Sequence, residues 1–413
     1  MLEVLAYTLL GVGLGTFTGL IPGVHVNNLA PLLVGVAAVS GLPPMNIVAA
    51  IVAMMMAHTI ISYIPATFLG APEPGTELSV LPAHRLLLEG RGYEVIRLTA
   101  FGCLGALMLS AALALPLSLV FAPAYMFIQP QMHLLLLAVI VVMIALERSC
   151  SGILWAIAIF LLSGLMGLFT LDTNLVRGDV ALLPLLSGLF GVSVLLLSAV
   201  RKSSLPKQNV DNSEPLEFRE NARALCAGTG AGVLTGIIPG IGPSQGTVLA
   251  QLVTRSSGTR EFLVGVSGVN TAKALFSFVA LYAIARPRSG AAVAVDQLVD
   301  KVGFNELLFL IGVALVAGGI ATVLHLRLGR LAARHIGGLP YREMCLTVIS
   351  GMAVMTFLYA GLIGLLILAT ATAIGVLPAV AKVKRTHCMG VIMLPCILYF
   401  AGVKDGVLAA IGL

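Results

Sequence analysis

The chain has 413 residues, of which 59% are hydrophobic and only 10% charged, with a mean hydropathy of +1.04 and a formal net charge of +6. Soluble domains carry roughly 25% charged residues, so this composition excludes a soluble globular protein and predicts an integral membrane protein. We expect the chain to lie in a lipid bilayer and to have no nucleic-acid partner.

Apolar runs long enough to cross a membrane, or to form paired half-spans, follow one another along the chain. Seven lie at about 4–21, 24–41, 45–70, 97–122, 132–147, 152–170 and 180–200. The first begins without the positive residues of a signal peptide, and we expect it to remain as structure. Seven more lie at about 224–239, 241–253, 262–285, 305–325, 344–358, 361–381 and 388–411. Residues 201–222 are hydrophilic and predict a linker between a first membrane repeat, 1–200, and a second, 223–413.

A glycine-rich segment of the first half returns in the second half. Gly11-Val-Gly-Leu-Gly-Thr-Phe-Thr-Gly-Leu-Ile-Pro-Gly23 matches Gly228-Thr-Gly-Ala-Gly-Val-Leu-Thr-Gly-Ile-Ile-Pro-Gly240 at eight of thirteen positions, 217 residues later. A Pro-Gly step ends a helix and frees backbone groups that hydrocarbon cannot satisfy. Paired breaks of this kind indicate a transporter whose substrate site lies near the bilayer midplane. We therefore predict that Pro22-Gly23 and Pro239-Gly240 lie close together at that site.

The distribution of basic residues predicts how the two halves are oriented. If each half is a hairpin that returns to its starting side and is followed by five crossings, the second half is inverted. This topology places 18 of the 24 basic residues on one side and only three on the other. By the positive-inside rule, the 18-residue side is cytoplasmic and both termini are extracytoplasmic. The sequence thus predicts an all-α polytopic protein of the plasma membrane, built from two inverted repeats, each a Pro-Gly-broken helical hairpin followed by about five transmembrane helices.

Small polar side chains follow each predicted break. His25, Asn27 and Asn28 come after the first, and Ser244, Gln245, Thr247 and Gln251 after the second. Helix starts offer unpaired N–H groups and a positive dipole end, which attract anions. We predict substrate contacts here, from His25, Asn27, Asn28, Ser244 and Gln245 together with Pro22, Gly23, Pro239 and Gly240. The alternative is that the polar groups only bond to freed backbone carbonyls and stabilise the breaks.

A second polar cluster follows in each half. The first-half residues are His58, Thr59, Glu73 and Glu77, and their counterparts are Asn270, Thr271, Lys273, Arg288 and Ser289. At an offset of 215, His58 falls opposite Lys273 and Glu73 opposite Arg288. Ionisable side chains in apolar spans mark a pathway, a proton relay or a buried pair. We assign the first-half residues to ion coupling and the second-half residues to substrate binding. Alternatively, Glu73 and Glu77 neutralise Arg286 and Arg288 in a structural bridge.

The chain lacks the signatures of several other chemistries. No glycine-rich loop with a following Lys-Ser/Thr is present, which argues against an ATP-driven pump. We find no metal-ligand or nucleophile–base pattern, so we expect no metal site, no catalytic residue and no cofactor apart from a coupling Na⁺ or H⁺. None of the six cysteines has CxxC spacing, and we interpret them as small apolar packing residues.

The order of these motifs resembles the TctA family, the large permease subunit of tripartite tricarboxylate transporters. The first half carries Gly19-Leu-Ile-Pro-Gly23, Gly70-Ala-Pro-Glu-Pro-Gly75 and Glu89-Gly-Arg-Gly92, and the second half carries Gly236-Ile-Ile-Pro-Gly240, Val266-Ser-Gly-Val-Asn-Thr271 and Arg286-Pro-Arg-Ser-Gly-Ala-Ala292. The resemblance implies a cation-coupled importer of carboxylates. It also implies two partners, an extracytoplasmic binding protein and a small membrane subunit.

Two other readings stay open at the level of the sequence. Polyprenyl-phosphate translocases also pair inverted repeats that contain Pro-Gly, and in that case the basic residues would hold a lipid phosphate. An intramembrane enzyme that acts on a lipid is a third reading. The sequence gives no oligomeric state.

Overall fold

The computed structural model describes residues 2–21, 26–71, 73, 75–145, 147, 149–173, 175–177, 180–200, 206–211, 216–238, 242–254, 258–336 and 341–410. The protein is 86% helical, and no strand occurs in these ranges. Among the described residues, seven helices are long and apolar enough to cross a membrane. There are eight if the segment Arg385–Phe400, which contains α17 (Gly390–Phe400), forms one span with α18 (Lys404–Ala410), which it meets at a sharp bend. The prediction of an all-α polytopic membrane protein is confirmed.

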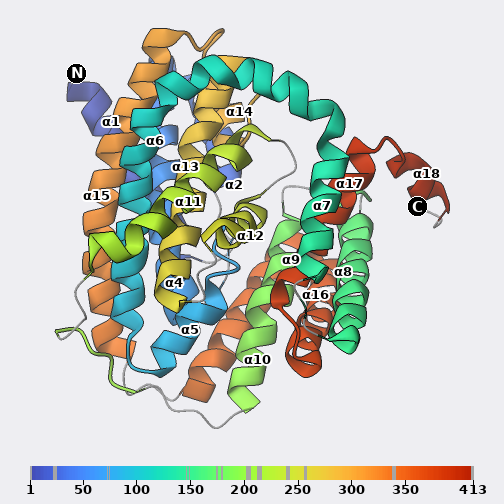
Figure 1. Cartoon of the computed structure of the whole chain (residues 1–413). Coiled ribbons are helices and arrows are strands. Elements are labelled where there is room, and N and C mark those ends of the chain that lie inside the picture. The colour runs from blue at the N-terminus through green and yellow to red at the C-terminus, as the bar shows by residue number, and fades with distance from the viewer. Residues whose placement is uncertain are drawn as a thin grey trace.

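Each half contains a similar succession of helices (Figure 1). The first half has α1 (Leu2–Leu20), α2 (Val26–Ser40), α3 (Pro44–Ile61), α4 (Tyr63–Phe68), α5 (Val80–Leu88), α6 (Gly92–Ile128), α7 (Met132–Ala145), α8 (Cys150–Leu171), α9 (Leu182–Leu186), the π-helical turn η2 (Ser187–Val192) and α10 (Ser193–Val200). The second half has α11 (Phe218–Ile237), α12 (Pro243–Thr254), α13 (Thr259–Ile284), α14 (Gly290–Leu298), α15 (Phe304–Ile336), α16 (Tyr341–Ala381), the short 3-10 helix η3 (Arg385–Met389), α17 and α18. A 3-10 turn, η1 (Gln129–Gln131), joins α6 to α7.

Local sequence signals account for several helix boundaries. Pro44 occupies the first turn of α3, where its missing N–H costs nothing. The Ser149 hydroxyl caps α8 by accepting a bond from the Gly152 N–H at 3.0 Å. Gly361 has a φ of +62° and kinks α16, between the two spans predicted at 344–358 and 361–381. The chain therefore follows the predicted segments, with a kinked helix where the sequence suggested two.

The same glycine-mediated contact joins the first and third helices of each half. A methyl group added to any of four glycines would lie only 2.2–2.5 Å from a backbone carbonyl oxygen of the facing helix. The glycines and the residues whose carbonyls they meet are Gly11 with Ala50, Gly15 with Met54, Gly228 with Gly265, and Gly232 with Val269. Small residues at this spacing let two helix backbones approach closely. The repeat seen in the sequence is therefore also a repeat of this helix contact.

The two halves interlock by reciprocal contacts. Helix α3 packs against α15, and its counterpart α13 packs against α6. Likewise α8 packs against α17, while α16 packs against η2 and α10. Figure 1 shows α6 and α15 running in opposite directions, as inverted repeats require. The inversion itself stays a prediction.

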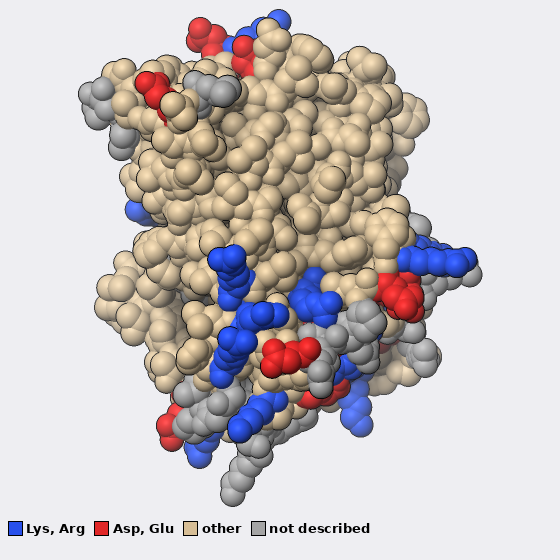
Figure 2. Space-filling model, turned by 90° about the vertical axis from the view of Figure 1, so that its left-hand side faces the viewer, with Lys and Arg blue, Asp and Glu red and all other residues tan. Residues whose placement is uncertain are grey.

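The surface separates into an apolar band and a basic end. Figure 2 shows Lys and Arg side chains gathered in the lower part of one face, below a broad band almost without charge. Large apolar side chains are exposed along several helices, such as Leu154, Leu161 and Leu165 on α8. Exposed apolar faces of this extent are typical of contact with lipid.

One described stretch of the predicted linker, residues 206–211, docks on the turn between α5 and α6. The Gln208 side chain accepts a bond from the Gly92 N–H at 2.8 Å and donates to the Leu87 carbonyl at 3.1 Å. The Asn209 N–H donates to the Gly90 carbonyl at 2.7 Å. This turn lies at the lower end of the molecule in Figure 1, whereas the N-terminus lies at the upper end. Helix α11 begins at Phe218, so its polar first turn overlaps the predicted linker.

Candidate functional site

His58, in the last turn of α3, has a polar neighbour at each ring nitrogen. Its Nε2 is 2.7 Å from the Glu73 carboxylate in the α4–α5 loop, and its Nδ1 is 3.0 Å from Thr18 Oγ1 on α1. The Thr18 hydroxyl also lies 3.1 Å from the Gly15 carbonyl, to which it can donate, and the tautomer of His58 sets whether Nδ1 donates to Thr18 or accepts from it. The 2.7 Å contact between Nε2 and Glu73 has room for one proton, which either group could carry.

The His58–Glu73 pair is shielded from solvent. The side chains are 6% and 4% exposed, respectively. Apart from this pair, neither carboxylate oxygen of Glu73 accepts a hydrogen bond from a residue that the structure describes. Loss of the shared proton would leave a buried carboxylate facing a ring lone pair, which is strongly unfavourable. The pair can thus hold one proton, and releasing it requires a change in its surroundings.

Glu77, in the same loop, connects the two halves of the protein. Its Oε1 accepts a 2.5 Å bond from the Ser244 hydroxyl, in the first turn of α12, and its Oε2 accepts a bond from the Gly75 N–H. Glu77 is only 4% exposed. The sequence assigned Ser244 and Glu77 to different clusters, and the fold joins them because the loop reaches the start of α12.

The loop also lies directly against α13. Gly75 has a φ of +103°, and a methyl group added there would lie 2.3 Å from Asn270 Oδ1. Nearby, the Tyr63 hydroxyl at the start of α4 donates to the Val266 carbonyl at 3.3 Å. Only glycine fits at position 75, because both the backbone conformation and the closeness of Asn270 exclude a side chain. Tyr63 was not among the predicted site residues.

Lys273 is a half-buried cation on α13, one turn beyond Asn270. Its charge and that of Glu77 act on each other. The predicted bridge between the first-half carboxylates and the arginines is absent among the described residues, since Glu73 pairs with His58 and Glu77 with Ser244. Six of the predicted residues thus lie in or around one loop: Glu73, Glu77, His58, Ser244, Asn270 and Lys273.

The α13–α14 connection carries the remaining basic residue of the predicted site. The Arg288 guanidinium lies over the Tyr125 ring of α6, with 4.9 Å from Cζ to the ring centroid. Next to it, Ser289 caps α14 by accepting a 3.1 Å bond from the Ala292 N–H, and its hydroxyl lies 3.0 Å from that of Ser277. Lys273 and Arg288 therefore have different neighbours.

Other predicted residues have simpler surroundings. The Gln245 Oε1 accepts a 2.8 Å bond from the Gly242 N–H at the start of α12, and its Nε2 is buried without a partner in the described part of the chain. The Thr59 hydroxyl donates to the Met55 carbonyl of its own helix at 2.8 Å, and Thr271 is fully buried. Gln245 thus caps the start of α12 through a backbone N–H, whereas the structural alternative named backbone carbonyls as the partners, so the choice between that alternative and substrate contact stays a prediction.

Part of the predicted site falls outside the described residues. These positions are Pro22, Gly23, His25, Pro239 and Gly240. Asn27 and Asn28 lie in the first turn of α2, but their side chains are outside the described set. The predicted closeness of the two Pro-Gly steps therefore stays a prediction.

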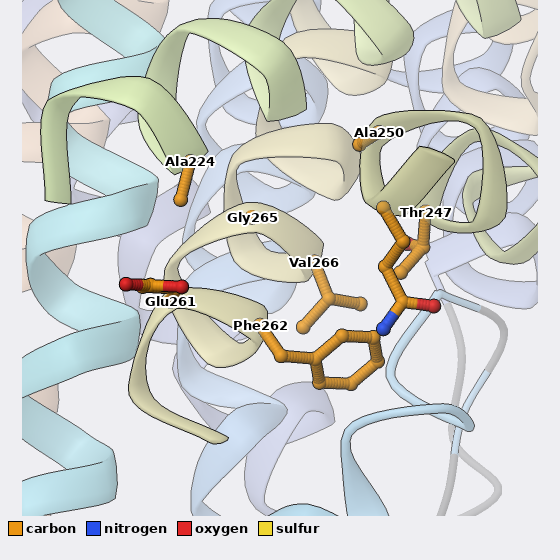
Figure 3. A pocket seen from close by; sticks show the side chains of 8 residues that line it. Ala224, Thr247, Ala250, Glu261, Phe262, Gly265 and Val266 are labelled. Atoms are coloured by element: carbon orange, nitrogen blue, oxygen red, sulfur yellow. The ribbon is translucent and has the colours of Figure 1, made fainter. Parts of the chain in front are cut away.

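A small hollow opens between α11, α12 and α13 (Figure 3). Its space is about 220 Å³ including the open mouth, and its lining consists of Ala224, Thr247, Ala250, Gln251, Glu261, Phe262, Gly265 and Val266. Figure 3 shows Phe262 and Val266 extending from α13 toward the helix that carries Thr247, while Glu261 points the other way. Ligand pockets usually exceed about 300 Å³. Thr247 and Gln251, which follow the second predicted break, line this hollow. None of the residues that we assigned to substrate binding or ion coupling does, so we do not assign the substrate to it.

Within the described ranges, no three His, Cys, Asp or Glu side chains lie close enough together to hold a metal ion. The polar groups of the candidate site are instead a proton-sharing pair, a hydrogen-bonded carboxylate, an amide and two cations. This set suits the binding of anions and protons rather than the ligation of a metal.

Comparison with known proteins identifies the family. Residues 5–390 match the Tripartite tricarboxylate transporter TctA family. The chain belongs to this family. It is also 26% identical to an uncharacterized protein of Methanocaldococcus jannaschii over 404 residues, which cover 96% of this chain and 98% of that protein. No solved structure matches it.

Membership of the TctA family confirms the resemblance that the motifs indicated. TctA proteins are transporter permeases, and seven or eight apolar helices make this chain a multi-pass membrane protein. Thr18, Tyr63 and Tyr125 adjoin the site but were missed by the sequence reasoning. Thr18 could have been found, because it recurs as Thr235 within the repeated motif.

Proposed function

We propose that this TctA-family chain is a secondary active permease that moves an anionic solute, a di- or tricarboxylate, by alternating access in symport with Na⁺ or H⁺. The observation that carries the proposal is the bond from Ser244 to Glu77, which joins the first-half loop to the start of α12 just beyond the second break. A polar contact between halves, surrounded by apolar helices, can form in one state of a transport cycle and open in another.

The substrate and the coupling ion use different parts of this cluster in our proposal. Lys273, Asn270 and Ser244 face the anion, because they supply a cation and two hydrogen-bonding groups around one loop. His58 and Glu73 serve coupling, because their contact can hold one proton and both side chains are shielded from solvent. An anion that binds to Lys273 would compete with Glu77 for the positive charge of Lys273. Because Glu77 and Glu73 lie in the same loop, this competition would link substrate binding to the coupling residues.

The direction of transport in this proposal is inward across the plasma membrane. Membership of a tripartite family supports two partners, an extracytoplasmic binding protein and a small membrane subunit. The basic end in Figure 2 would face the cytoplasm and both termini the outside. Lys207→Cys, at an exposed linker position, tests this orientation after Cys150 and Cys226 are replaced by Ser. A membrane-impermeant maleimide applied to intact cells should leave it unlabelled; labelling from outside would reverse the assigned orientation.

Flux into proteoliposomes tests the function itself. Radiolabelled citrate, succinate and other di- and tricarboxylates would be offered under imposed Na⁺ or H⁺ gradients, with and without the partner subunits. We expect concentrative uptake of at least one carboxylate under one of the two gradients. Absence of uptake for every carboxylate, with all partners present, would contradict the proposal.

A further inference from the structure

The guanidinium of Arg288 packs against an aromatic ring on one face, and the N–H groups along one of its edges have no hydrogen-bond partner among the described residues. Its face lies on the Tyr125 ring, 4.9 Å from Cζ to the centroid. Its Nε and Nη2 atoms are buried and bond to no residue in the described part of the chain. Buried donors without a partner cost free energy, so a native protein rarely retains two of them side by side without a purpose.

Arg91 shows what fills such an edge elsewhere in the same protein. Its Nε donates to Glu94 Oε2 at 2.7 Å and its Nη2 to Glu94 Oε1 at 2.9 Å. The two N–H groups along this edge are parallel and match the two oxygens of a carboxylate. Arg288 presents the same pair of donors, and no carboxylate of a residue that the structure describes bonds to them.

The polar groups that could have bonded to the Nε–Nη2 edge of Arg288 are bonded elsewhere, so the edge is available to a ligand. Glu73, which holds the equivalent position in the first half, pairs with His58 and belongs to another loop. The neighbouring Ser289 hydroxyl is engaged with the Ala292 N–H and Ser277. Stacking on Tyr125 fixes the plane of the guanidinium, and this lowers the entropy lost when a ligand binds.

We infer that the Nε–Nη2 edge of Arg288 is a binding site for one oxyanion group with two acceptor oxygens, which the transported solute supplies as a carboxylate. The site lies where α14 begins and adjoins α3, because the Ser289 hydroxyl next to Arg288 is 3.8 Å from the Met55 sulfur. The inference rests on the proposed function for the identity of the ligand. The shared chemistry, an anionic group with two oxygens in a plane, is also that of a lipid phosphate, so the test includes both sources.

The test compares Arg288→Lys with wild-type protein in nanodiscs. Probes are radiolabelled citrate, succinate and a short-chain polyprenyl phosphate, each titrated to give a dissociation constant. Lysine keeps the charge but cannot offer two parallel donors. We expect the carboxylate that wild type binds to bind Arg288→Lys at least about tenfold more weakly. Arg286→Lys, two residues away at an exposed position, is the matched control and should bind as wild type does.

Thermal unfolding separates a ligand site from a structural role. Because the substitution breaks no hydrogen bond from this edge to a described residue, Arg288→Lys should unfold at the wild-type temperature without ligand and lose the stabilisation that the carboxylate gives. Arg91→Lys should unfold at a lower temperature with or without ligand, since Glu94 already fills its edge. A lowered unfolding temperature for Arg288→Lys alone, with unchanged ligand affinity, would overturn the inference.

The remaining outcomes separate this site from the proposed function. Carboxylate transport by wild type with an unchanged constant in Arg288→Lys refutes the site and leaves the function standing. Binding of polyprenyl phosphate but of no carboxylate, weakened by Arg288→Lys, supports the oxyanion edge and refutes the proposed substrate. Binding of none of the probes by wild type counts against both.

Discussion

The α4–α5 loop of the first half and the α13–α14 connection of the second occupy matching positions in the repeat but differ in how their charges are met. In the first half, Glu73 lies 2.7 Å from His58, and we call this pair closed because both side chains are shielded from solvent. In the second, the matching residues are Lys273 and Arg288, and two guanidinium nitrogens of Arg288 have no protein partner among the described residues. The matching positions of the two halves thus carry different chemical groups. The closed pair is suited to holding a coupling proton, and the cations Lys273 and Arg288, which we call open because neither forms an ion pair among the described residues, are suited to an anion.

The scaffold itself is shared closely by the two halves. The α1–α3 and α11–α13 interfaces use glycines at the same spacing, and each glycine faces a backbone carbonyl at nearly the same distance. Close backbone packing tolerates little change, whereas the loops that follow can exchange charged residues. This difference explains why the glycine motif is visible as a repeat in the sequence while the polar residues diverge.

The largest expected effect is on stability, and it tests whether these two interfaces are equivalent. Gly15→Ala and Gly232→Ala each place a methyl group 2.3–2.5 Å from a carbonyl oxygen, and we expect each to lower the free energy of unfolding by about 2–3 kcal/mol. Gly13→Ala and Gly230→Ala, two residues earlier on the same helices, meet nothing within 4 Å. They should be neutral or stabilise by up to about 1 kcal/mol through helix propensity.

Thermal unfolding of the four variants in detergent checks this prediction. The matched pairs change the same atoms on the same helices, so differences in expression or detergent affect both members alike. If Gly15→Ala destabilises the protein and Gly232→Ala does not, the two interfaces are not equivalent and the structural repeat is wrong.

The next effect concerns the closed pair. Glu73→Gln keeps the shape and hydrogen-bonding capacity of the side chain but cannot share a proton with His58. If the pair carries the coupling proton, uptake driven by a pH gradient should fall roughly a hundredfold, equivalent to about 2.7 kcal/mol. Exchange of labelled for unlabelled substrate requires no net proton movement and should persist. Unchanged gradient-driven uptake by Glu73→Gln would exclude this pair as the coupling site and favour Na⁺ elsewhere.

The fold followed from the sequence more completely than the site did. Repeated Gly11 and Gly228 motifs, apolar runs of sufficient length and the offset between halves are local or periodic signals, and each corresponds to helices in the structure. The contacts of Glu77 with Ser244 and of Arg288 with Tyr125 join residues more than 160 positions apart. Such contacts depend on how loops lie across helices of the other half, and no spacing in the sequence encodes that.

A smaller effect tests the open cation. Lys273→Met removes the charge but keeps an unbranched apolar stem, and we expect the apparent substrate constant in flux assays to rise at least about tenfold. Arg330→Met is the control, because Arg330 is exposed on the basic end and lies over the Tyr93 ring. The charge of Lys273 is coupled to Glu77. If Glu77→Gln restores the constant of Lys273→Met, the cation serves only to neutralise that carboxylate, and the comparison between a closed and an open half fails.

The smallest expected effect is on the uptake rate, and it tests the hydrogen bond between Ser244 and Glu77 that joins the two halves. Ser244→Ala removes the hydroxyl that donates to Glu77, while the Gly75 N–H still supports the other carboxylate oxygen. A hydrogen bond to a charged group contributes about 1.5–3 kcal/mol, but water or substrate can replace part of it here, so we expect a three- to tenfold fall in uptake rate. Thr247→Val, one turn later on α12, removes a hydroxyl that donates only to the Pro243 carbonyl of its own helix. Because both changes delete one buried hydroxyl from the same helix, equal rates for the two variants would mean that the contact with Glu77 has no part in transport. A lower rate for Ser244→Ala alone would place that contact on the transport cycle, with the first-half loop moving against α12 as the substrate passes.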